Sequence, residues 1–307
     1  MNVISVFLKG FAMGAANVIP GVSGGTVAFI TGIYERLINA IKSFDIQAIK
    51  LLKNREFGAL LKHVDFSFLA VLCLGVVVSI ASMAKVLAWA YEEHEVYVSA
   101  LFFGLIAMSI YSVAKMVKKW SIVCFFALII GCAAAVGLAF IEQSGESTNF
   151  LYLMLCGAIA MCCMILPGVS GSFILILLGN YFLILNSVNE LRAGAFDKAL
   201  PIIIPVGIGA VVGIAALSRF LSWLFKKYHD VTTSLIAGFV AGSLFVIWPW
   251  KTPITKLIGE KVKVVDYTRY LPDFTEKTSL FAVGFILLGA LAMIIMEFIG
   301  KKKNKLS

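Results

Sequence analysis

Long apolar segments separated by short polar stretches dominate the sequence. A transmembrane helix needs about 20 consecutive apolar residues, and ten segments reach or approach that length. They are residues 3–19, 22–41, 66–90, 97–117, 121–141, 150–166, 169–188, 200–225, 232–249 and 279–299. Two neighbouring pairs of segments are each interrupted by a Pro-Gly dipeptide, at Pro20-Gly21 and at Pro167-Gly168. The pattern predicts a helical membrane protein that crosses the bilayer many times.

The composition supports this prediction. Of 307 residues, 61% are hydrophobic and 14% are charged, whereas soluble domains carry about 25% charged residues. A water-soluble chain of this length would have too much surface to cover with so few polar side chains. The net charge of +9 lies in short clusters between apolar segments, not on one soluble face as in a nucleic-acid-binding protein. We therefore expect membrane lipids, and no nucleic acid, as partners of the chain.

Two blocks of sequence recur, which indicates an internal duplication. Residues 10–41 align without a gap on residues 157–188. The identical pairs are Gly10 and Gly157, Pro20 and Pro167, Gly21 and Gly168, Val22 and Val169, Ser23 and Ser170, Gly24 and Gly171, Gly32 and Gly179, Tyr34 and Tyr181, and Asn39 and Asn186. Residues 75–111 align on residues 209–245, with Trp89 opposite Trp223 and Lys85 opposite Arg219. The chain is therefore a duplication of a five-segment unit.

The charges of the loops predict the topology. Lysine and arginine gather in loop 42–62, after the fourth and eighth segments and in the C-terminal tail, whereas loops 91–96 and 142–149 are acidic. Because basic loops stay in the cytoplasm, this order requires each hairpin to return to the side from which it came. The second repeat is then inverted, and both termini are cytoplasmic. The basic loop 250–278, which this topology places outside, is an argument against it.

The expected fold is an all-α polytopic membrane protein with one transmembrane domain, residues 1–307. It consists of two inverted repeats, residues 1–145 and 146–307, each made of a re-entrant Pro-Gly broken helical hairpin and three transmembrane helices. The alternative is that the hairpins span the membrane completely, which would put the lysine-rich tail outside.

The hairpin tips carry the most informative polar residues. Proline ends a helix, glycine permits a close approach of the backbone, and the helix that follows begins with free N–H groups at the positive end of its dipole. Serine and threonine add hydroxyl donors. These features favour an anion such as phosphate or carboxylate. The predicted head-group ligands are Gly21, Ser23, Gly24, Gly25 and Thr26 at the first tip, and Gly168, Ser170, Gly171 and Ser172 at the second.

A Pro-Gly-Val-Ser-Gly run could also be an ordinary tight turn between two spanning helices. Two copies at matched positions, both between apolar segments, favour the functional interpretation. Inverted repeats with broken helices that meet near the membrane midplane are typical of secondary transporters.

Two cations lie inside apolar segments, at Lys85 and Arg219, each followed four residues later by a tryptophan. They are predicted to receive an anionic substrate, one near each membrane surface. The alternative is that both side chains extend to the interface beside an aromatic belt.

Two further polar residues are candidates for coupling or for lining the site. Glu35 could bind a coupling proton or sodium ion, although a surface pair with Arg36 is the more ordinary explanation. Asn17 could cap the first tip or line the site. The six cysteines lie in apolar runs, and no cysteine or histidine pattern indicates a metal site. We therefore expect no metal, no cofactor and no catalytic residues.

Residues 10–35 carry the run MGAANVIPGVSGGT from Met13 to Thr26, followed by Gly32-Ile33-Tyr34-Glu35. This stretch resembles a bacterial membrane family that was long described only as a domain of unknown function and is now described as polyprenyl-phosphate transporters. The second motif, from Leu166 to Ser172, resembles the same family's second signature. The resemblance extends over essentially the whole chain.

The resemblance implies transport of undecaprenyl phosphate, the lipid carrier of cell-wall synthesis, from the outer to the inner leaflet of the bacterial cytoplasmic membrane. The residues alone indicate an anion site and do not identify the anion as a lipid. A channel or carrier for a small inorganic anion therefore remains an alternative. A membrane enzyme acting on lipid phosphates would need acid–base and nucleophilic groups, for which the sequence offers no candidates. The oligomeric state is left open.

Overall fold

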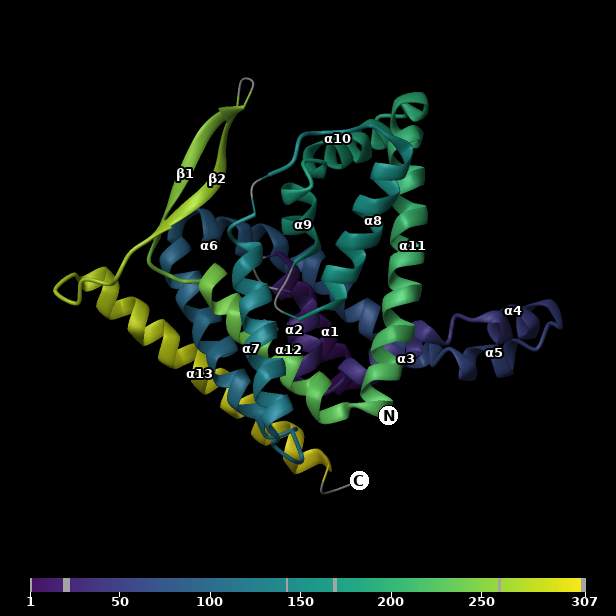
Figure 1. Ribbon diagram of the computed structural model, residues 1–307, viewed down its shortest axis with the longest axis horizontal. Coiled ribbons are helices and arrows are strands. Elements are labelled where there is room, and N and C mark those ends of the chain that lie inside the picture. Colours follow the sequence, from purple (N-terminus) through teal and green to yellow (C-terminus); the bar gives the residue numbers. More distant parts are fainter. Residues whose placement is uncertain (1, 19–22, 142, 168–169, 259–260, 305–307) are drawn as a thin grey trace.

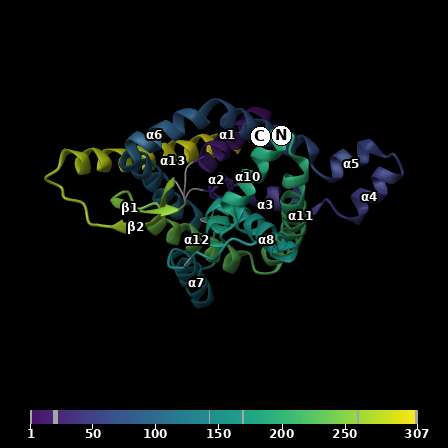
Figure 2. The same ribbon diagram turned by 90° about the horizontal axis from the view of Figure 1, so that it is seen from above.

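The computed structural model describes residues 2–18, 23–141, 143–167, 170–258 and 261–304, and it is mostly helical (Figures 1 and 2). The helices of the first half are α1 (Val3–Val18), α2 (Gly24–Ile30), α3 (Tyr34–Lys42), α4 (Ile46–Lys53), α5 (Phe57–His63), α6 (Phe66–Ala114) and α7 (Ile122–Leu138). Those of the second half are α8 (Phe150–Ile165), α9 (Gly171–Leu177), α10 (Tyr181–Arg192), α11 (Phe196–Lys227), α12 (His229–Val246) and α13 (Lys277–Asn304).

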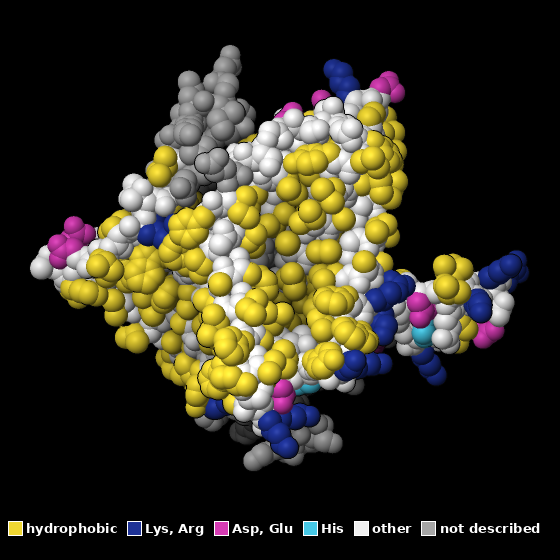
Figure 3. Space-filling view, in the orientation of Figure 1, with side chains coloured by type: hydrophobic (Ala, Val, Ile, Leu, Met, Phe, Trp, Pro, Cys, Tyr) yellow, Lys and Arg dark blue, Asp and Glu magenta, His cyan; other side chains and the backbone are white. Residues whose placement is uncertain are grey.

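Within the described residues, five segments are long and apolar enough to cross a membrane. They are Phe66–Met83, Glu93–Ala114, Phe196–Lys227, His229–Val246 and Lys277–Ile295. Three shorter apolar helices, Val3–Asn17, Ile122–Leu138 and Phe150–Ile165, lie among them. Hydrophobic side chains cover the middle of the face in Figure 3, and lysine and arginine gather at its lower end. The chain is a multi-pass membrane protein.

The helices on either side of both predicted tips lie within the described residues, and the returning helices are short. The returning helices α2 and α9 have seven residues each, so they are about 10 Å long and cannot cross a hydrocarbon core of about 30 Å. Each ends at a glycine with positive φ, Gly32 (70°) and Gly179 (76°), a conformation that glycine adopts without strain. Helix α10 then leaves α9 at an angle of 113°. The segments predicted at 22–41 and 169–188 are therefore each broken into two helices.

A second break divides α6. The sequence predicted two helices separated by a polar loop at residues 91–96, and this loop is wrong, because α6 is helical through these residues apart from His94. His94 has φ −137° and ψ 44°. Tyr228, which separates α11 from α12, has φ −135° and ψ 51°. The two residues are related by the offset that aligns the second repeated block, so the same backbone break occurs at matched positions.

Glycines place the helices of each half in contact at matched positions. A Cβ atom at Gly10 of α1 would collide with the carbonyl oxygen of Leu72 in α6. At the equivalent place in the second half, a Cβ atom at Gly157 of α8 would collide with the carbonyl oxygen of Val206 in α11. Leu72 and Val206, which lie just before the second repeated block, are related by the same offset as its two copies. The packing of α1 on α6 is therefore repeated as the packing of α8 on α11.

The last helix of each half packs against the other half. Gly104 of α6 lies against Ile286 of α13, and Gly238 of α12 lies against Leu128 of α7. In return, Gly289 of α13 lies against Leu101 of α6, and Gly131 of α7 lies against Leu235 of α12. The two halves are thus intertwined through α7 and α13. These contacts agree with a duplication, and the inverted relation of its copies stays a prediction.

The core lies where the first hairpin meets the central helices. Its largest buried side chains include Phe29 and Tyr34 from the hairpin, Phe68 from α6 and Ile236 from α12. The rings of Phe29 and Tyr34 pack edge to face with centroids 5.3 Å apart. The bend after α2 is therefore fixed by apolar packing against both halves.

The all-α prediction is wrong in one region. Residues of the loop 250–278 form an antiparallel hairpin of strands β1 (Lys251–Ile258) and β2 (Lys261–Arg269), with a register shift between Ile254 and Thr255. Figure 1 shows this hairpin at the opposite end of the molecule from the α11–α12 turn. Its β-branched residues favour extended structure, and they lie outside the segments that could span a membrane.

Candidate functional site

The first hairpin tip is closed by its own side chains. The Asn17 carboxamide accepts a hydrogen bond from the backbone N–H of Gly24 at 2.7 Å, and the Ser23 hydroxyl accepts one from the N–H of Gly25 at 3.1 Å. Ser23 and Thr26 are 2% and 1% exposed. Two of the N–H groups expected to bind an anion are therefore already paired. Gly21 lies outside the described residues.

The first tip touches the second hairpin. The Ser23 hydroxyl donates to the carbonyl oxygen of Met164 at 3.5 Å, near the limit for a hydrogen bond. A Cβ atom at Gly25 would lie 2.5 Å from the carbonyl oxygen of Ile165, so only glycine allows this approach. The start of α2 therefore lies against the end of α8, and the structure brings the two hairpins together at Ser23 and Gly25.

The second tip is more open. Ser170 caps α9 by accepting from the N–H of Phe173 at 3.2 Å, and its hydroxyl oxygen lies 3.3 Å from that of Ser172. Ser172 is exposed, and Ser170 and Gly171 are half-buried. A pair of neighbouring hydroxyls is thus accessible to a ligand at this tip. Gly168 lies outside the described residues.

Arg219 does not contact either hairpin among the described residues. Its side chain is exposed, and its Nη1 donates to the carbonyl oxygen of Ala215 on the same helix at 2.8 Å. Trp223, one turn further along α11, is 48% exposed and stacks on Phe220. This arrangement resembles a cation beside an aromatic belt. The side chain of Lys85 lies outside the described residues, so the structure does not test its predicted role.

Glu35 and Arg36 are not partners. The guanidinium of Arg36 binds the Asp65 carboxylate through two hydrogen bonds, of 2.7 and 3.0 Å. Glu35 Oε1 instead lies 3.1 Å from Nε2 of His229. The surface pair of Glu35 with Arg36 is therefore wrong, and the first hairpin is joined through Glu35 to the start of α12.

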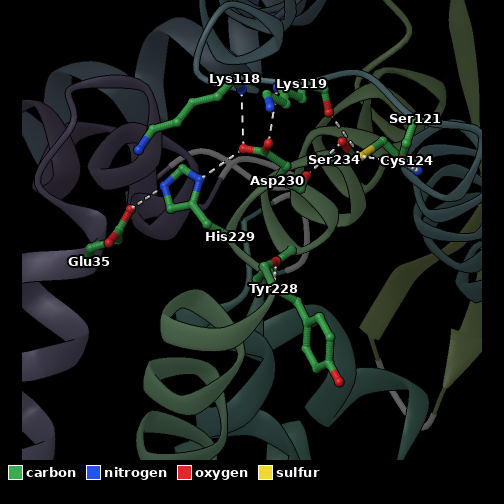
Figure 4. Close-up of polar contacts among 10 residues, drawn as sticks. Glu35, Lys118, Lys119, Ser121, Cys124, Tyr228, His229, Asp230 and Ser234 are labelled. Atoms are coloured by element: carbon green, nitrogen blue, oxygen red, sulfur yellow. Dashed lines mark hydrogen bonds and ion pairs between the residues drawn. The ribbon is translucent and has the colours of Figure 1, made fainter.

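His229 lies between two carboxylates (Figure 4). Its Nε2 faces Glu35, and its Nδ1 lies 3.2 Å from Oδ1 of Asp230. The two Asp230 oxygens also accept the backbone N–H groups of Lys118 and Lys119, at 3.1 and 3.0 Å. Sequence reasoning missed this group because His229 and Asp230 stand at a segment boundary, 194 residues from Glu35.

A second polar group occurs at the other end of the molecule. Glu95 follows the break in α6, accepts a hydrogen bond from the Tyr91 hydroxyl at 2.8 Å, and lies 3.6 Å from Lys251 Nζ at the start of β1. The Lys251 side chain is 4% exposed, and burial lowers the pKa of its ammonium. Glu95 and His229 occupy equivalent positions in the two repeated blocks. Lys251 could not be singled out from the sequence, because its partner Glu95 lies far away in the chain.

A lysine also stabilises the far end of α2. Lys9 Nζ donates to the carbonyl oxygen of Thr31 at 2.7 Å, where the helix dipole is negative.

The surface in Figure 3 is hollowed between α7 and α8, and hydrophobic side chains line its sides. The molecule thus combines polar hairpin tips with an apolar recess on its outer surface.

Comparison with known proteins identifies relatives over almost the whole chain. The family described as VCA0040-like, undecaprenyl phosphate translocase-like, matches residues 13–265. A protein of Vibrio cholerae serotype O1 named polyprenyl-phosphate transporter is 36% identical over 304 residues, which cover 96% of each chain. One of the same name from Staphylococcus aureus is 29% identical over 259 residues, 79% of this chain and 85% of the relative. No solved structure matches. The chain belongs to the VCA0040-like, undecaprenyl phosphate translocase-like family.

Proposed function

We propose that this protein transports a polyprenyl phosphate, and specifically undecaprenyl phosphate, across the bacterial cytoplasmic membrane. The expected direction is from the outer to the inner leaflet, which would return the lipid carrier for reuse in cell-envelope synthesis. The observation that carries the proposal is the 36% identity over 96% of the chain to a relative named polyprenyl-phosphate transporter. The apolar recess between α7 and α8 (Figure 3) supports a lipid substrate.

The phosphate head group is the part of the substrate that needs the protein. Moving its charge uncompensated through hydrocarbon would cost several kcal/mol or more. Hydroxyl groups at the tips can replace its hydration, and the accessible pair is Ser170 and Ser172. The polyprenyl tail can stay in lipid throughout. In this proposal the head group passes between the tips while Lys85 and Arg219 receive it near opposite surfaces.

The proposed movement is a rocking of two inverted repeats, residues 1–145 and 146–307, about the re-entrant hairpins. Both termini are cytoplasmic in this arrangement. The matched contacts of α1 with α6 and of α8 with α11 support two similar packing units, which α7 and α13 join to each other.

Purified protein in liposomes tests the substrate. We expect transfer of undecaprenyl phosphate between leaflets, and no accelerated flux of chloride or inorganic phosphate. Flux of a small anion without lipid transfer would replace the proposal by an anion channel or carrier. Liposomes that contain a correctly folded protein and show neither activity would contradict both functions.

Variants of the tips and cations test the site. Replacement of both Ser170 and Ser172 by alanine, and Arg219→Gln alone, should each slow lipid transfer about tenfold or more, because a hydrogen bond to a charged group contributes about 1.5–3 kcal/mol. Arg192→Gln is the control, since Arg192 is also an exposed arginine but lies at the end of α10. Normal transfer by Arg219→Gln would identify that arginine as an interface anchor and leave the site to the hairpins.

A further inference from the structure

A neutral imidazole at His229 would have one N–H donor too few for the two carboxylates, of Glu35 and Asp230, that face its ring nitrogens. A neutral imidazole has one N–H donor and one lone pair. Here both ring nitrogens face carboxylate oxygens, at 3.1 and 3.2 Å. If the ring is neutral and both carboxylates are ionised, the lone pair of one ring nitrogen would face a carboxylate oxygen, and the two would repel each other. The geometry therefore favours one additional proton, on the imidazole or on a carboxylate.

We propose that Glu35, His229 and Asp230 form a proton-binding site, and that release of its proton breaks the contact between Glu35 of α3 and His229 of α12 during the transport cycle. This inference rests on the proposed transport function. It assigns to these residues the binding of a coupling proton, and it explains how a proton could act on the first hairpin.

The two carboxylates are not equivalent, and this difference decides which contact breaks. Asp230 is adjacent to His229 in the chain and is held by two backbone N–H groups, of Lys118 and Lys119. Glu35 comes from another helix, and in the described part of the chain the only hydrogen bond recorded for its carboxylate is with His229. When the proton leaves, the neutral ring keeps one donor. The contact with Glu35 is then the one that is lost, because the described part of the chain offers that carboxylate no second hydrogen bond.

The other charged groups near His229 are cationic. Lys118 and Lys119 lie in the segment before α7, and Figure 4 shows the Lys118 side chain extending toward Glu35. Lys226 and Lys227 lie in the last turn of α11, where Lys227 Nζ is 5.6 Å from the centre of the Trp223 ring. Lysine side chains in general keep their charge near neutral pH, whereas histidine is the side chain that gains or loses a proton there. The proposed site therefore depends on the proton held between His229 and the two carboxylates.

A chain of aromatic rings connects the proton site to the hairpin. Phe225 lies with its ring centre 6.0 Å from that of His229 and 6.0 Å from that of Tyr34. Tyr34 packs on Phe29 in α2, and α2 begins at the Ser23 cap. A displacement of α3 from α12 would therefore act on the buried side chains that fix the bend of the hairpin.

The first experiment compares transport at different pH values, with the same buffer on both sides of the liposome so that protein orientation does not matter. Lipid transfer by the natural protein should rise severalfold between about pH 6 and about pH 8, the interval of histidine titration. His229→Gln and Glu35→Gln should each remove this dependence. His63→Gln is the matched control, since His63 also lies 3.1 Å from a carboxylate, that of Asp45, but in the α4–α5 extension.

The second experiment requires no transport. Hydrogen–deuterium exchange of α3 is compared between the natural protein and His229→Gln at equal pH, which cancels the intrinsic pH dependence of exchange. We expect greater protection of α3 in the natural protein at about pH 6, and no difference at about pH 8. His63→Gln should leave α3 unchanged.

The outcomes separate the two proposals. Unchanged pH dependence of transfer in His229→Gln, or equal exchange of α3 in both proteins at both pH values, would overturn the proton site while leaving the transport function intact. Absence of lipid transfer in every protein would contradict the transport function, and the exchange comparison would still decide whether the group binds a proton. Should His229→Gln fail to fold, Glu35→Gln replaces it, because the Glu35 side chain is 44% exposed.

Discussion

Asn17 determines how much of the first hairpin tip is available to a ligand. Its carboxamide oxygen occupies the N–H of Gly24, and its side-chain atoms lie within 3.1 Å of the position of a Cβ at Gly24. An anion could reach that N–H only by displacing the carboxamide. In the proposed site, Asn17 would therefore compete with the substrate or move aside for it.

Replacing Asn17 tests this competition. Asn17→Ala leaves the start of α2 without one cap and should lower the free energy of unfolding by about 1 kcal/mol. It should also increase binding of a phosphate head group to the unpaired N–H, measured as a lower half-saturating lipid concentration in the transfer assay. Asn149→Ala is the control, because Asn149 caps α8 in the same way but away from the tips. A loss of stability without any change in half-saturation would limit Asn17 to a capping role.

The Glu95 carboxylate is the charged partner that stabilises the buried ammonium of Lys251. Glu95→Gln should lower the free energy of unfolding by about 1–3 kcal/mol, because a largely buried charge loses its ionised partner. Thermal unfolding in detergent measures the effect. Glu93→Gln changes the same charge two residues earlier on an exposed side chain and should leave the melting temperature almost unchanged. Equal effects of the two substitutions would show that Lys251 is stabilised by the carbonyl oxygen of Val246 and the ring of Tyr267 instead.

At the scale of helices, glycines decide which surfaces can meet. Gly209 of α11 lies against the backbone of Met154 in α8, whereas a Cβ at Gly207, half a turn earlier, meets nothing within 4 Å. Small residues permit such close approach of helices in membranes, where packing and not the hydrophobic effect holds helices together. The pair offers a matched comparison on one helix.

Gly209→Ala should separate α8 from α11 and reduce both the yield of folded protein and lipid transfer. Gly207→Ala should change neither, and it could stabilise α11 slightly, since alanine is the better helix former. Thermal unfolding and the transfer assay measure the two effects. Similar behaviour of the two variants would contradict the close contact of these helices.

The hairpins were predictable from sequence because their signals are local. Pro167-Gly168 and the glycines Gly32 and Gly179 mark the turns directly, and the serine caps follow. The β1–β2 hairpin was missed although the β-branched run from Lys261 to Arg269 is typical of a strand. The break at His94 has no proline or glycine to announce it. Only the folded structure reveals this break, in the backbone angles of His94, which agree with those of Tyr228.

The candidate site was predictable in part for the same reason. Ser23 and Ser170 stand in repeated motifs, and both proved to be helix caps. His229 has no motif, and its importance depends on a contact with Glu35 that only the folded chain creates. Pairing across 194 residues leaves no periodicity or spacing in the sequence from which it could be inferred.

At the scale of the whole molecule, the inverted arrangement predicts the side on which each loop lies. In a variant whose six natural cysteines are replaced, a cysteine at Ser144 should react with an impermeant reagent added outside the cell, and one at Asn304 should not. The reason is the alternation of acidic and basic loops. Labelling after cell lysis controls for accessibility of both positions. The reverse pattern would contradict the topology.

The exchange of α7 and α13 between the halves has a consequence for biosynthesis. As the ribosome releases the chain, α7 enters the bilayer before α12, the helix against which Gly131 packs, has been made. The second part of α6 stays without its partner for longer, because α13 is translated after α12. Neither half can complete its packing alone, so a nascent chain stopped at any earlier point exposes glycine-lined helix faces to lipid and to membrane proteases. Synthesis of α13 therefore completes the packing between the two halves.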